Sequence, residues 1–360
     1  MIVNNHTLSD LYTDYLLAST SRTTATGLSD LLEGSISHDK ITRLLSDGEA
    51  FNSKVVWKAV KPIVREIETG DGCISIDDSI EEKPYTDKNE LINWYWDHTV
   101  NRSVKGVNFV SAFYSHRGAE VPLAVEFVKK DQTITDPKTG KEKQISSKSK
   151  NEIYRELLRT VERNGVKYKY VLNDIWFSSA ENMKFVKTEL KRDFIMAIKQ
   201  NRNVALSKKD KQQGKYVKIE SLTLEPNTTS EVYFEQVDFP VLLIKRIFKN
   251  KDDSEGIQYL VISDLNLTYE QITAIYQKRW KVEEFHKSVK SNASFAKAPA
   301  KTVQTQLSHF YASILAYVKM EWLKFRTGCN HFALKSKIYI QALNAAWMEL
   351  HKLSTRPITK

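Results

Sequence analysis

The first part of the chain, residues 1–68, carries apolar residues at helical spacing in short stretches. The stretches "LSDLYTDYLLAST", "GLSDLLEG" and "SHDKITRLLSDG" each have apolar residues three or four positions apart, the spacing of one helix face. Glycine, serine and threonine separate them. The pattern therefore predicts a small helical bundle.

After "TGDG" the apolar pattern changes to that of strands. The runs "CISID" (73–77), "NFVSAFYS" (108–115) and "VPLAVEFV" (121–128) are rich in β-branched and aromatic residues and are bounded by turn residues. Residues 129–150 are polar and hold seven lysines against three acids, which predicts a mobile loop.

Helices and strands then alternate. The predicted elements are a helix at 151–165, a strand at 168–174, a helix at 179–192 and a strand at 193–199. This order predicts an α/β fold. Residues 200–265 are polar and β-rich, and we interpret them as an insertion.

The stretch "AIYQKRWKVEEFHKSVK" (274–290) predicts one cationic helix with two adjacent glutamates. Thr268 and Gln271 have the spacing of a capping box, so the helix is expected to begin there. Its apolar residues fall on one narrow stripe, which we expect to face the core. They are Ile275, Val282, Phe285 and Val289.

A second stripe of this helix is polar. At about 100° per residue, Tyr276, Arg279, Glu283 and Lys290 share an arc of roughly 60°, whereas Glu284 points away from it. The simplest explanation is an Arg279–Glu283 pair on a solvated face. That explanation does not account for the tyrosine and the lysine on the same stripe.

Composition narrows the class of partner. The 360 residues include 54 Lys and Arg against 44 Asp and Glu, a net charge of +10, which favours a polyanion such as nucleic acid. We find no secretory signal and no apolar run near 18 residues, so no membrane span is expected. Cys73 and Cys329 are too far apart in sequence to suggest a zinc motif.

Two acids end predicted strands and could carry chemistry. Asp77 ends "CISID" and Asp174 ends "YVLND". Strand ends are where open α/β sheets bind their ligands, and two carboxylates brought together there need a cation. Two Mg²⁺ ions held by carboxylates can drive phosphoryl transfer, and Glu283 is our candidate for the third ligand.

Other acids compete for this role. Asp78 follows Asp77 and points to the opposite face of the strand, so either could bind metal on physical grounds. Asp264 ends another strand and Asp193 begins one. For any single acid of this kind, a turn or cap role is the simpler explanation.

A family resemblance rests on these residues. The pattern Tyr276-x2-Arg279-x3-Glu283-x6-Lys290 resembles the Tyr-Arg-Glu-Lys signature of bacterial insertion-sequence transposases with an Asp-Asp-Glu site, in the cut-and-paste group that forms DNA hairpins. "SIDDS" resembles the first-aspartate motif, which favours Asp77, and "VLNDIWF" the second. The resemblance covers roughly residues 70–325.

The resemblance implies a ribonuclease H-like catalytic core with a β-rich insertion, flanked by helical regions. It also implies that the N-terminal region binds DNA ends, although a packing or oligomerisation bundle is an alternative. The expected parts are an end-binding domain at 1–68, a core at 69–199 and 266–300, the insertion at 200–265 and a C-terminal helical region at 301–360.

The implied activity is cleavage of transposon inverted repeats through hairpin intermediates, and joining of the ends to target DNA. The implied partners are double-stranded DNA and a second copy of the chain in a synaptic complex. The expected setting is the cytoplasm of a bacterium, at the nucleoid. The alternatives are a metal-dependent nuclease on the same core without strand transfer, and a catalytically inactive DNA-binding derivative.

The implied site contains two ions of Mg²⁺, or Mn²⁺, on Asp77, Asp174 and Glu283. Further residues are predicted to bind DNA: the signature residues hold phosphates, two neighbours on the helix assist, and a tyrosine of the insertion stacks on a flipped base unless it is a core residue. They are Tyr276, Arg279, Lys290, Lys287, His286 and Tyr259.

Overall fold

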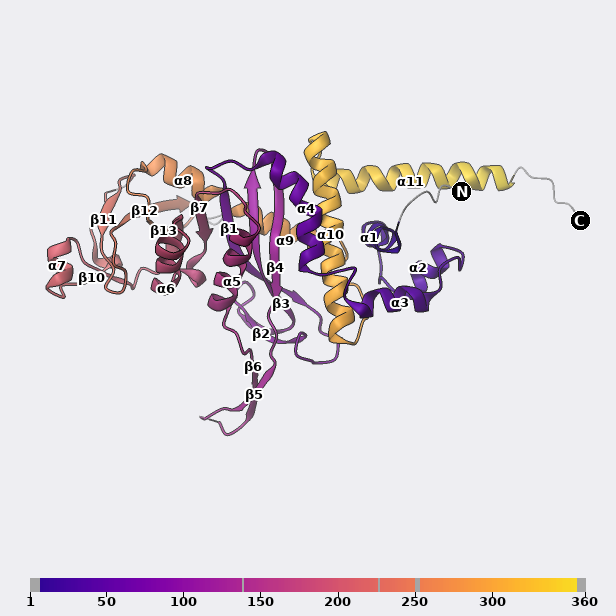
Figure 1. Ribbon diagram of the computed structural model, residues 1–360, viewed down its shortest axis with the longest axis horizontal. Helices are drawn as coiled ribbons and strands as arrows, with labels where there is room; N and C mark the ends of the chain where they lie inside the picture. The colour runs from indigo at the N-terminus through magenta and orange to yellow at the C-terminus, as the bar shows by residue number, and fades with distance from the viewer. Residues whose placement is uncertain (1–6, 138, 226, 250–252, 355–360) are drawn as a thin grey trace, which may run out of the picture. The chain divides into compact units, whose positions relative to one another are not determined.

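The computed structural model describes residues 7–137, 139–225, 227–249 and 253–354 (Figure 1). The chain divides into two compact units. One unit is Val60–Phe285, and the other combines Met1–Ala59 with His286–Lys360. Each unit is considered by itself below.

Nine strands of the described residues form one mixed sheet in the unit Val60–Phe285. The order is β11-β12-β13-β8-β7-β1-β3-β2, with β4 on β3; β7 pairs in parallel with β1 and β8, and the other pairs are antiparallel. A mixed α/β unit of this kind is consistent with the predicted ribonuclease H-like core. The strands are β1 (Cys73–Glu82), β2 (Asn93–Asp97), β3 (Arg102–His116), β4 (Ala119–Phe127), β7 (Tyr170–Asn173), β8 (Asp193–Ile198), β11 (Ser230–Val232), β12 (Val241–Lys249) and β13 (Glu255–Ile262).

Helix α5 (Lys150–Arg163) covers one face of this sheet, against β3 and β4. A capping box of Ser149 and Glu152 starts the helix, and its apolar face is buried. Ile153, Leu157 and Val161 lie on that face, as the helical spacing predicts.

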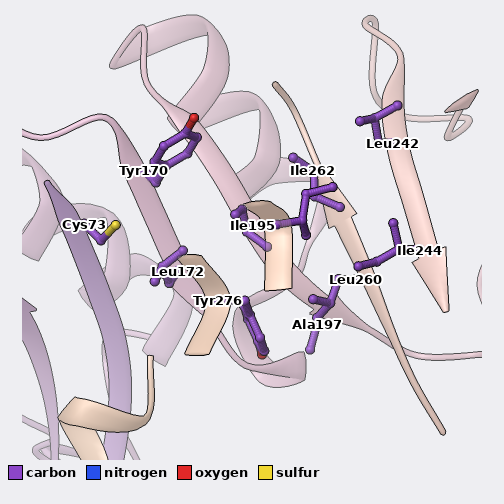
Figure 2. Close-up of a cluster of buried hydrophobic side chains, with 11 residues drawn as sticks. Cys73, Tyr170, Leu172, Ile195, Ala197, Leu242, Ile244, Leu260, Ile262 and Tyr276 are labelled. Atoms are coloured by element: carbon purple, nitrogen blue, oxygen red, sulfur yellow. The ribbon is translucent and has the colours of Figure 1, made fainter. Parts of the chain in front are cut away.

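Helices α8 (Tyr269–Gln277) and α9 (Trp280–Asn292) pack on the other face. Phe285 of α9 stacks on Phe113 of β3 with ring centroids 5.0 Å apart. Figure 2 shows Tyr276 of α8 among apolar side chains of the strands. The buried cluster is Cys73, Tyr170, Leu172, Ile195, Ala197, Leu242, Ile244, Leu260, Ile262, Ile272 and Tyr276.

The single helix predicted at 274–290 is wrong, because two helices form. The capping box at Thr268 and Gln271 is present and starts α8, but α8 ends before Lys278. The turn between the helices uses hydrogen bonds three residues apart: the N–H of Arg279 donates to Tyr276 O, and that of Val282 to Arg279 O. The tighter turn changes the direction of the polar stripe at Arg279.

The polar stretch 129–150, predicted as a mobile loop, contains a hairpin of β5 (Gln132–Thr135) and β6 (Glu142–Ile145) (Figure 1). Gly140, with φ of 66°, makes the turn possible, and its N–H donates to Asp136 O. The sequence pattern does not predict strand β2, because the alternation of exposed tryptophans with buried residues covers only five positions.

Three strands of the predicted insertion, β11 to β13, continue the central sheet beyond β8. The predicted helix 179–192 forms as a short helix followed by a π-helical turn. The remaining small elements of this unit are η1 (Ile175–Phe177), α6 (Ala180–Lys184), η2 (Phe185–Glu189), β9 (Asn203–Val204), α7 (Lys208–Gln212), β10 (Val217–Lys218) and η3 (Ile219–Ser221).

The other unit is helical in the residues that the structure describes. Helices α1 and α3 pack on α10, where buried Tyr12 hydrogen-bonds His309 Nδ1 at 2.9 Å. None of the described helices is long and apolar enough to cross a membrane. The helices are α1 (Leu8–Ala18), α2 (Ala25–Leu31), α3 (His38–Asp47), α10 (Val303–Thr327) and α11 (His331–Ser354), and α4 (Ser53–Ile67) runs from this unit into the sheet unit.

Candidate active site

The neighbours Asp77 and Asp78 lie on opposite faces of β1. Asp77 is on the face that α8 and α9 cover, because it shares the alternation of Cys73 in the buried cluster. Asp78 faces α5, where its Oδ2 accepts hydrogen bonds from Lys150 Nζ at 2.6 Å and Asn108 Nδ2 at 3.1 Å. The two carboxylates therefore have different partners.

Asp174 lies beside Asp77 at the end of the neighbouring parallel strand. Ile76 of β1 is in register with Asn173 of β7, so Asp77 and Asp174 are the next residues along each strand. Asp174 caps the turn η1, its Oδ1 accepting from the backbone N–H of Trp176 at 3.0 Å. Asp174 directly follows β7, as predicted, but Asp77 does not end its strand, because β1 continues to Glu82 through its antiparallel pairing with β3. The two acids meet where the parallel pairing of β1 with β7 stops.

These two acids are destabilised as anions. Burial raises the pKa of Asp77 well above its ordinary value, and the charge of Asp174 raises it further, while Arg279 acts in the opposite direction. Burial also raises the pKa of Asp174 to about 6, with a smaller contribution from Asp78. A cation close to both carboxylates would relieve this repulsion.

Arg279 supplies positive charge to this site. One guanidinium nitrogen lies 3.5 Å from Asp77 Oδ2 and another 2.7 Å from Glu283 Oε1. The group also lies over the ring of Tyr276, 5.8 Å from its centroid. The Arg279–Glu283 pair is present, but Arg279 is only 15% exposed, so the pair is not on a solvated face.

The donor set suits a hard divalent cation. Asp77, Asp174 and Glu283 offer only carboxylate oxygens, which Mg²⁺ prefers. Among the described residues, however, no three acid, histidine or cysteine side chains are arranged to hold one metal ion. Glu283 is paired with Arg279 through its Oε1.

The competing acids at strand ends have structural partners. Asp264 accepts from Tyr170 OH at 2.9 Å and pairs with Lys169 Nζ at 2.8 Å. Asp193 pairs with Lys187 at 2.6 Å. Neither is among the charges that act on Asp77 or Asp174.

A cavity of about 550 Å³ adjoins Asp174. Tyr259 of β13 lines it, although its side chain is mostly buried, and Tyr276 and Arg279 also line it. Phe248 and Ile257 of the paired strands β12 and β13 add exposed apolar surface.

The remaining predicted DNA-binding residues belong to the helical unit. His286 is buried, whereas Lys287 is exposed and its Nζ lies 5.6 Å from the ring centroid of Phe332. Lys290 is half-buried. Their contact with DNA stays a prediction.

Sequence patterns did not reveal two residues that position the acids. Asn173 accepts from Tyr154 OH at 3.1 Å through its side chain and from Tyr276 OH at 3.3 Å through its carbonyl. Lys150 pairs with Asp78 at 2.6 Å on the α5 side of β1. The sequence indicates a role for Asn173 only through its position next to Asp174. The contacts of Asn173 and Lys150 form only when helices pack on the sheet, so local sequence patterns do not predict them.

Comparison with known proteins gives one informative match. The family model described as DDE superfamily endonuclease matches residues 4–222, which include Asp77 and Asp174 but not Glu283. No curated protein matches the chain.

Among solved structures, an Argonaute of Kluyveromyces polysporus with a guide RNA is 11% identical, with a TM-score of 0.26. The match covers 86% of this chain and spans only 38% of the length of that Argonaute. A likeness this weak supports no argument about fold or function.

Proposed function

The chain belongs to the DDE superfamily endonuclease family, and on that premise we propose that it is a DNA transposase. It would cut the ends of a mobile element by metal-dependent phosphoryl transfer and join them to a new DNA site. The observation that supports this most is the arrangement of Asp77 and Asp174 on adjacent parallel strands with Glu283 across a shared arginine.

In this proposal Asp77, Asp174 and Glu283 hold Mg²⁺ or Mn²⁺, two ions in each site. The bound ions would activate the attacking oxygen and stabilise the leaving oxygen. Glu283 turns from Arg279 toward the aspartates, which releases the Arg279 guanidinium to hold a DNA phosphate in a bidentate pair. Tyr276 stays fixed by its bond to the Asn173 carbonyl and supports that arginine.

The reaction is a series of displacements at phosphorus. Water attacks a phosphodiester at the element's end and a 3′-hydroxyl leaves. That hydroxyl attacks the opposite strand to give a hairpin, water reopens the hairpin, and the freed 3′-hydroxyl finally attacks target DNA. Each step breaks one P–O bond and forms another, so one set of carboxylates serves them all.

The other parts are assigned roles within the same proposal. Residues 1–68 bind the inverted repeats, the core at 69–199 and 266–300 carries the chemistry, and the insertion at 200–265 holds Tyr259 against a flipped base. Two copies act together, so that two ends are cut in one complex. DNA binding also involves Lys290, Lys287 and His286. The C-terminal region 301–360 follows the core.

The test uses a plasmid that carries the reading frame with its flanking DNA. With Mg²⁺ and a second plasmid as target, the full chain should release the flanked segment, form hairpin ends and insert the segment into the target. Glu283→Gln should lower the cleavage rate by at least about 100-fold, as expected for loss of a group that acts in the transition state, and should keep DNA binding.

Asp78→Asn is the matched control, because Asp78 adjoins Asp77 but faces α5. It should keep most of the cleavage rate. Cleavage without insertion would establish the nuclease alternative instead. Full metal-dependent cleavage by Glu283→Gln would overturn the assignment of the site, and no reaction under any condition would favour an inactive DNA-binding derivative.

A further inference from the structure

Three aromatic rings form a connected cluster next to Asp174. The imidazole of His98 stacks on the indole of Trp176, with centroids 4.3 Å apart and planes 27° from parallel. Trp96 meets His98 edge-on, and its Nε1–H donates to His98 Nδ1 at 3.2 Å. The cluster joins strand β2, the turn after it and the turn η1.

This cluster is tied to the candidate active site through the backbone. The N–H of Trp176 donates to Asp174 Oδ1, so the indole begins two residues from the carboxylate. Trp96 is on the sheet face of Asp77: it is in register with Ser103, and Ser103 lies on the same alternation of β3 as Ser111, the partner of Asp77. Trp96 and Asp77 therefore lie on one face of the sheet, and Trp176 is bonded to Asp174.

The rings are held in place but not buried. Trp176 is 49% exposed and Trp96 is 51% exposed, and His98 is also exposed. One face of the imidazole is covered by Trp176 and its Nδ1 edge by Trp96, so the exposure of His98 comes from its other face and its Nε2 edge. A core role would bury these rings, whereas a recognition surface presents them.

Two lysines lie near the cluster. Lys199 Nζ lies 4.8 Å from the centroid of the Trp176 ring, and Lys199 also lines the cavity beside Asp174. Lys105 of β3 is in register with Trp94, two residues from Trp96 on the same side of β2. Trp176 has His98 stacked on it and Lys199 over its ring, so the outer face of His98 is the stacking surface. An open imidazole face beside lysines suits a nucleobase attached to a phosphate backbone.

We propose that His98, Trp96 and Trp176 form a stacking site for an unpaired base of the DNA strand that lies at the carboxylates. The inference rests on the proposed function, because it takes that strand to be DNA. A base inside a duplex is already stacked on both faces, so the site favours single-stranded DNA next to the cut. The lysines hold the adjoining phosphates, and a purely apolar partner would leave them unused.

The site is distinct from the cavity lined by Tyr259. Tyr259 comes from β13 and is mostly buried, whereas the three rings come from β2, its following turn and η1, and all are exposed. Lys199 lies between them, because it lines the cavity and also contacts Trp176. One unpaired base could thus occupy the cavity and a second the aromatic cluster, with Lys199 next to both.

The test is binding of fluorescein-labelled DNA to the full chain in EDTA, where no cleavage occurs. A blunt duplex is compared with the same duplex carrying a short single-stranded overhang of DNA or of RNA. Trp176→Ala and His98→Ala should each weaken overhang binding by about tenfold, within the range for loss of one stacking ring, and should leave blunt-duplex binding unchanged. Trp176→Phe, which keeps a ring, should restore most of the affinity.

Trp94→Ala is the matched control, because Trp94 is 52% exposed on the same strand and makes no ring contact with the cluster in the described structure. It should bind both DNAs like the wild type. A 2-aminopurine in the overhang should change its fluorescence on binding the wild type but not on binding His98→Ala.

Equal weakening of blunt-duplex binding, or an effect of Trp94→Ala as large as that of Trp176→Ala, would overturn the stacking site, as would preference for the RNA overhang. These readouts do not depend on cleavage. A chain that shows them but never cuts DNA would therefore contradict the proposed function and leave the stacking site standing.

Discussion

Two adjacent aspartates show how strongly surroundings decide the role of a residue. Asp77 and Asp78 have the same side chain, but the pleat of β1 points one toward Asp174 and Arg279 and the other toward Lys150. Burial, together with the charge of Asp174, raises the pKa of Asp77, whereas Asp78 is paired with Lys150. Only the first environment calls for an added cation.

The raised pKa of Asp174 predicts a pH dependence of stability. Its pKa is about 6 in the folded chain against 3.8 for the ordinary side chain, so the folded state holds the proton more tightly. The free energy of unfolding should therefore fall as pH rises from below 4 to above 6, by up to about 3 kcal/mol from this residue. Asp174→Asn removes that contribution.

Urea unfolding of both proteins in EDTA, repeated across this pH range, measures the effect. The variant should gain stability relative to the wild type as pH rises. A difference between the two proteins that stays constant with pH would contradict the raised pKa.

At the scale of elements, the break between α8 and α9 shapes the site. A continuous helix would have kept Tyr276, Arg279 and Glu283 on one stripe. The tight turn at Lys278 and Arg279 instead leaves Tyr276 in the buried cluster and brings the guanidinium between Asp77 and Glu283. The turn between the two helices, and not one continuous polar stripe, thus places Arg279 beside the acids.

A second element contact, in the helical unit, predicts a stability effect. His331 starts α11 and bridges two buried groups, Ser288 Oγ and Glu321 Oε2, each at 2.8 Å. His331→Ala leaves buried Glu321 with one partner fewer, although Lys324 still pairs with it at 3.1 Å. We expect a loss of about 2 kcal/mol in the free energy of unfolding.

Urea unfolding followed by circular dichroism measures this loss. His38→Ala is the control, because the side chain of His38 is exposed on α3, and it should change stability by less than about 0.5 kcal/mol. Equal effects of the two substitutions would show that the bridge to Glu321 contributes nothing.

At the scale of the whole molecule, the proposed function predicts that positive charge governs the affinity for DNA. The net charge of +10 should give binding that weakens steeply with salt, because each phosphate contact releases a counterion. Lys290→Ala should lower the slope of log K against log salt by about one, whereas Lys290→Arg should keep it. Titrations of a flank-derived duplex at several salt concentrations measure the slope, and an unchanged slope for Lys290→Ala would remove Lys290 from the phosphate contacts.

Local patterns in the sequence determined much of the fold. The apolar face of α5, the capping box of α8 and the strand segments that lead into Asp77 and Asp174 all follow from spacing over a few residues. Helix and strand periods are properties of the backbone, so the sequence alone carries them. The candidate acids could therefore be named before any contact was known.

Tertiary structure decided how these pieces meet. The guanidinium of Arg279 between Asp77 and Glu283, the extension of the sheet by β11 to β13, and the stack of His98 on Trp176 join residues far apart in the chain. No local period encodes such contacts, because they depend on which faces bury together and which charges are left to neutralise one another. The acids could be read from the sequence, but their counter-ion and their aromatic neighbours could not.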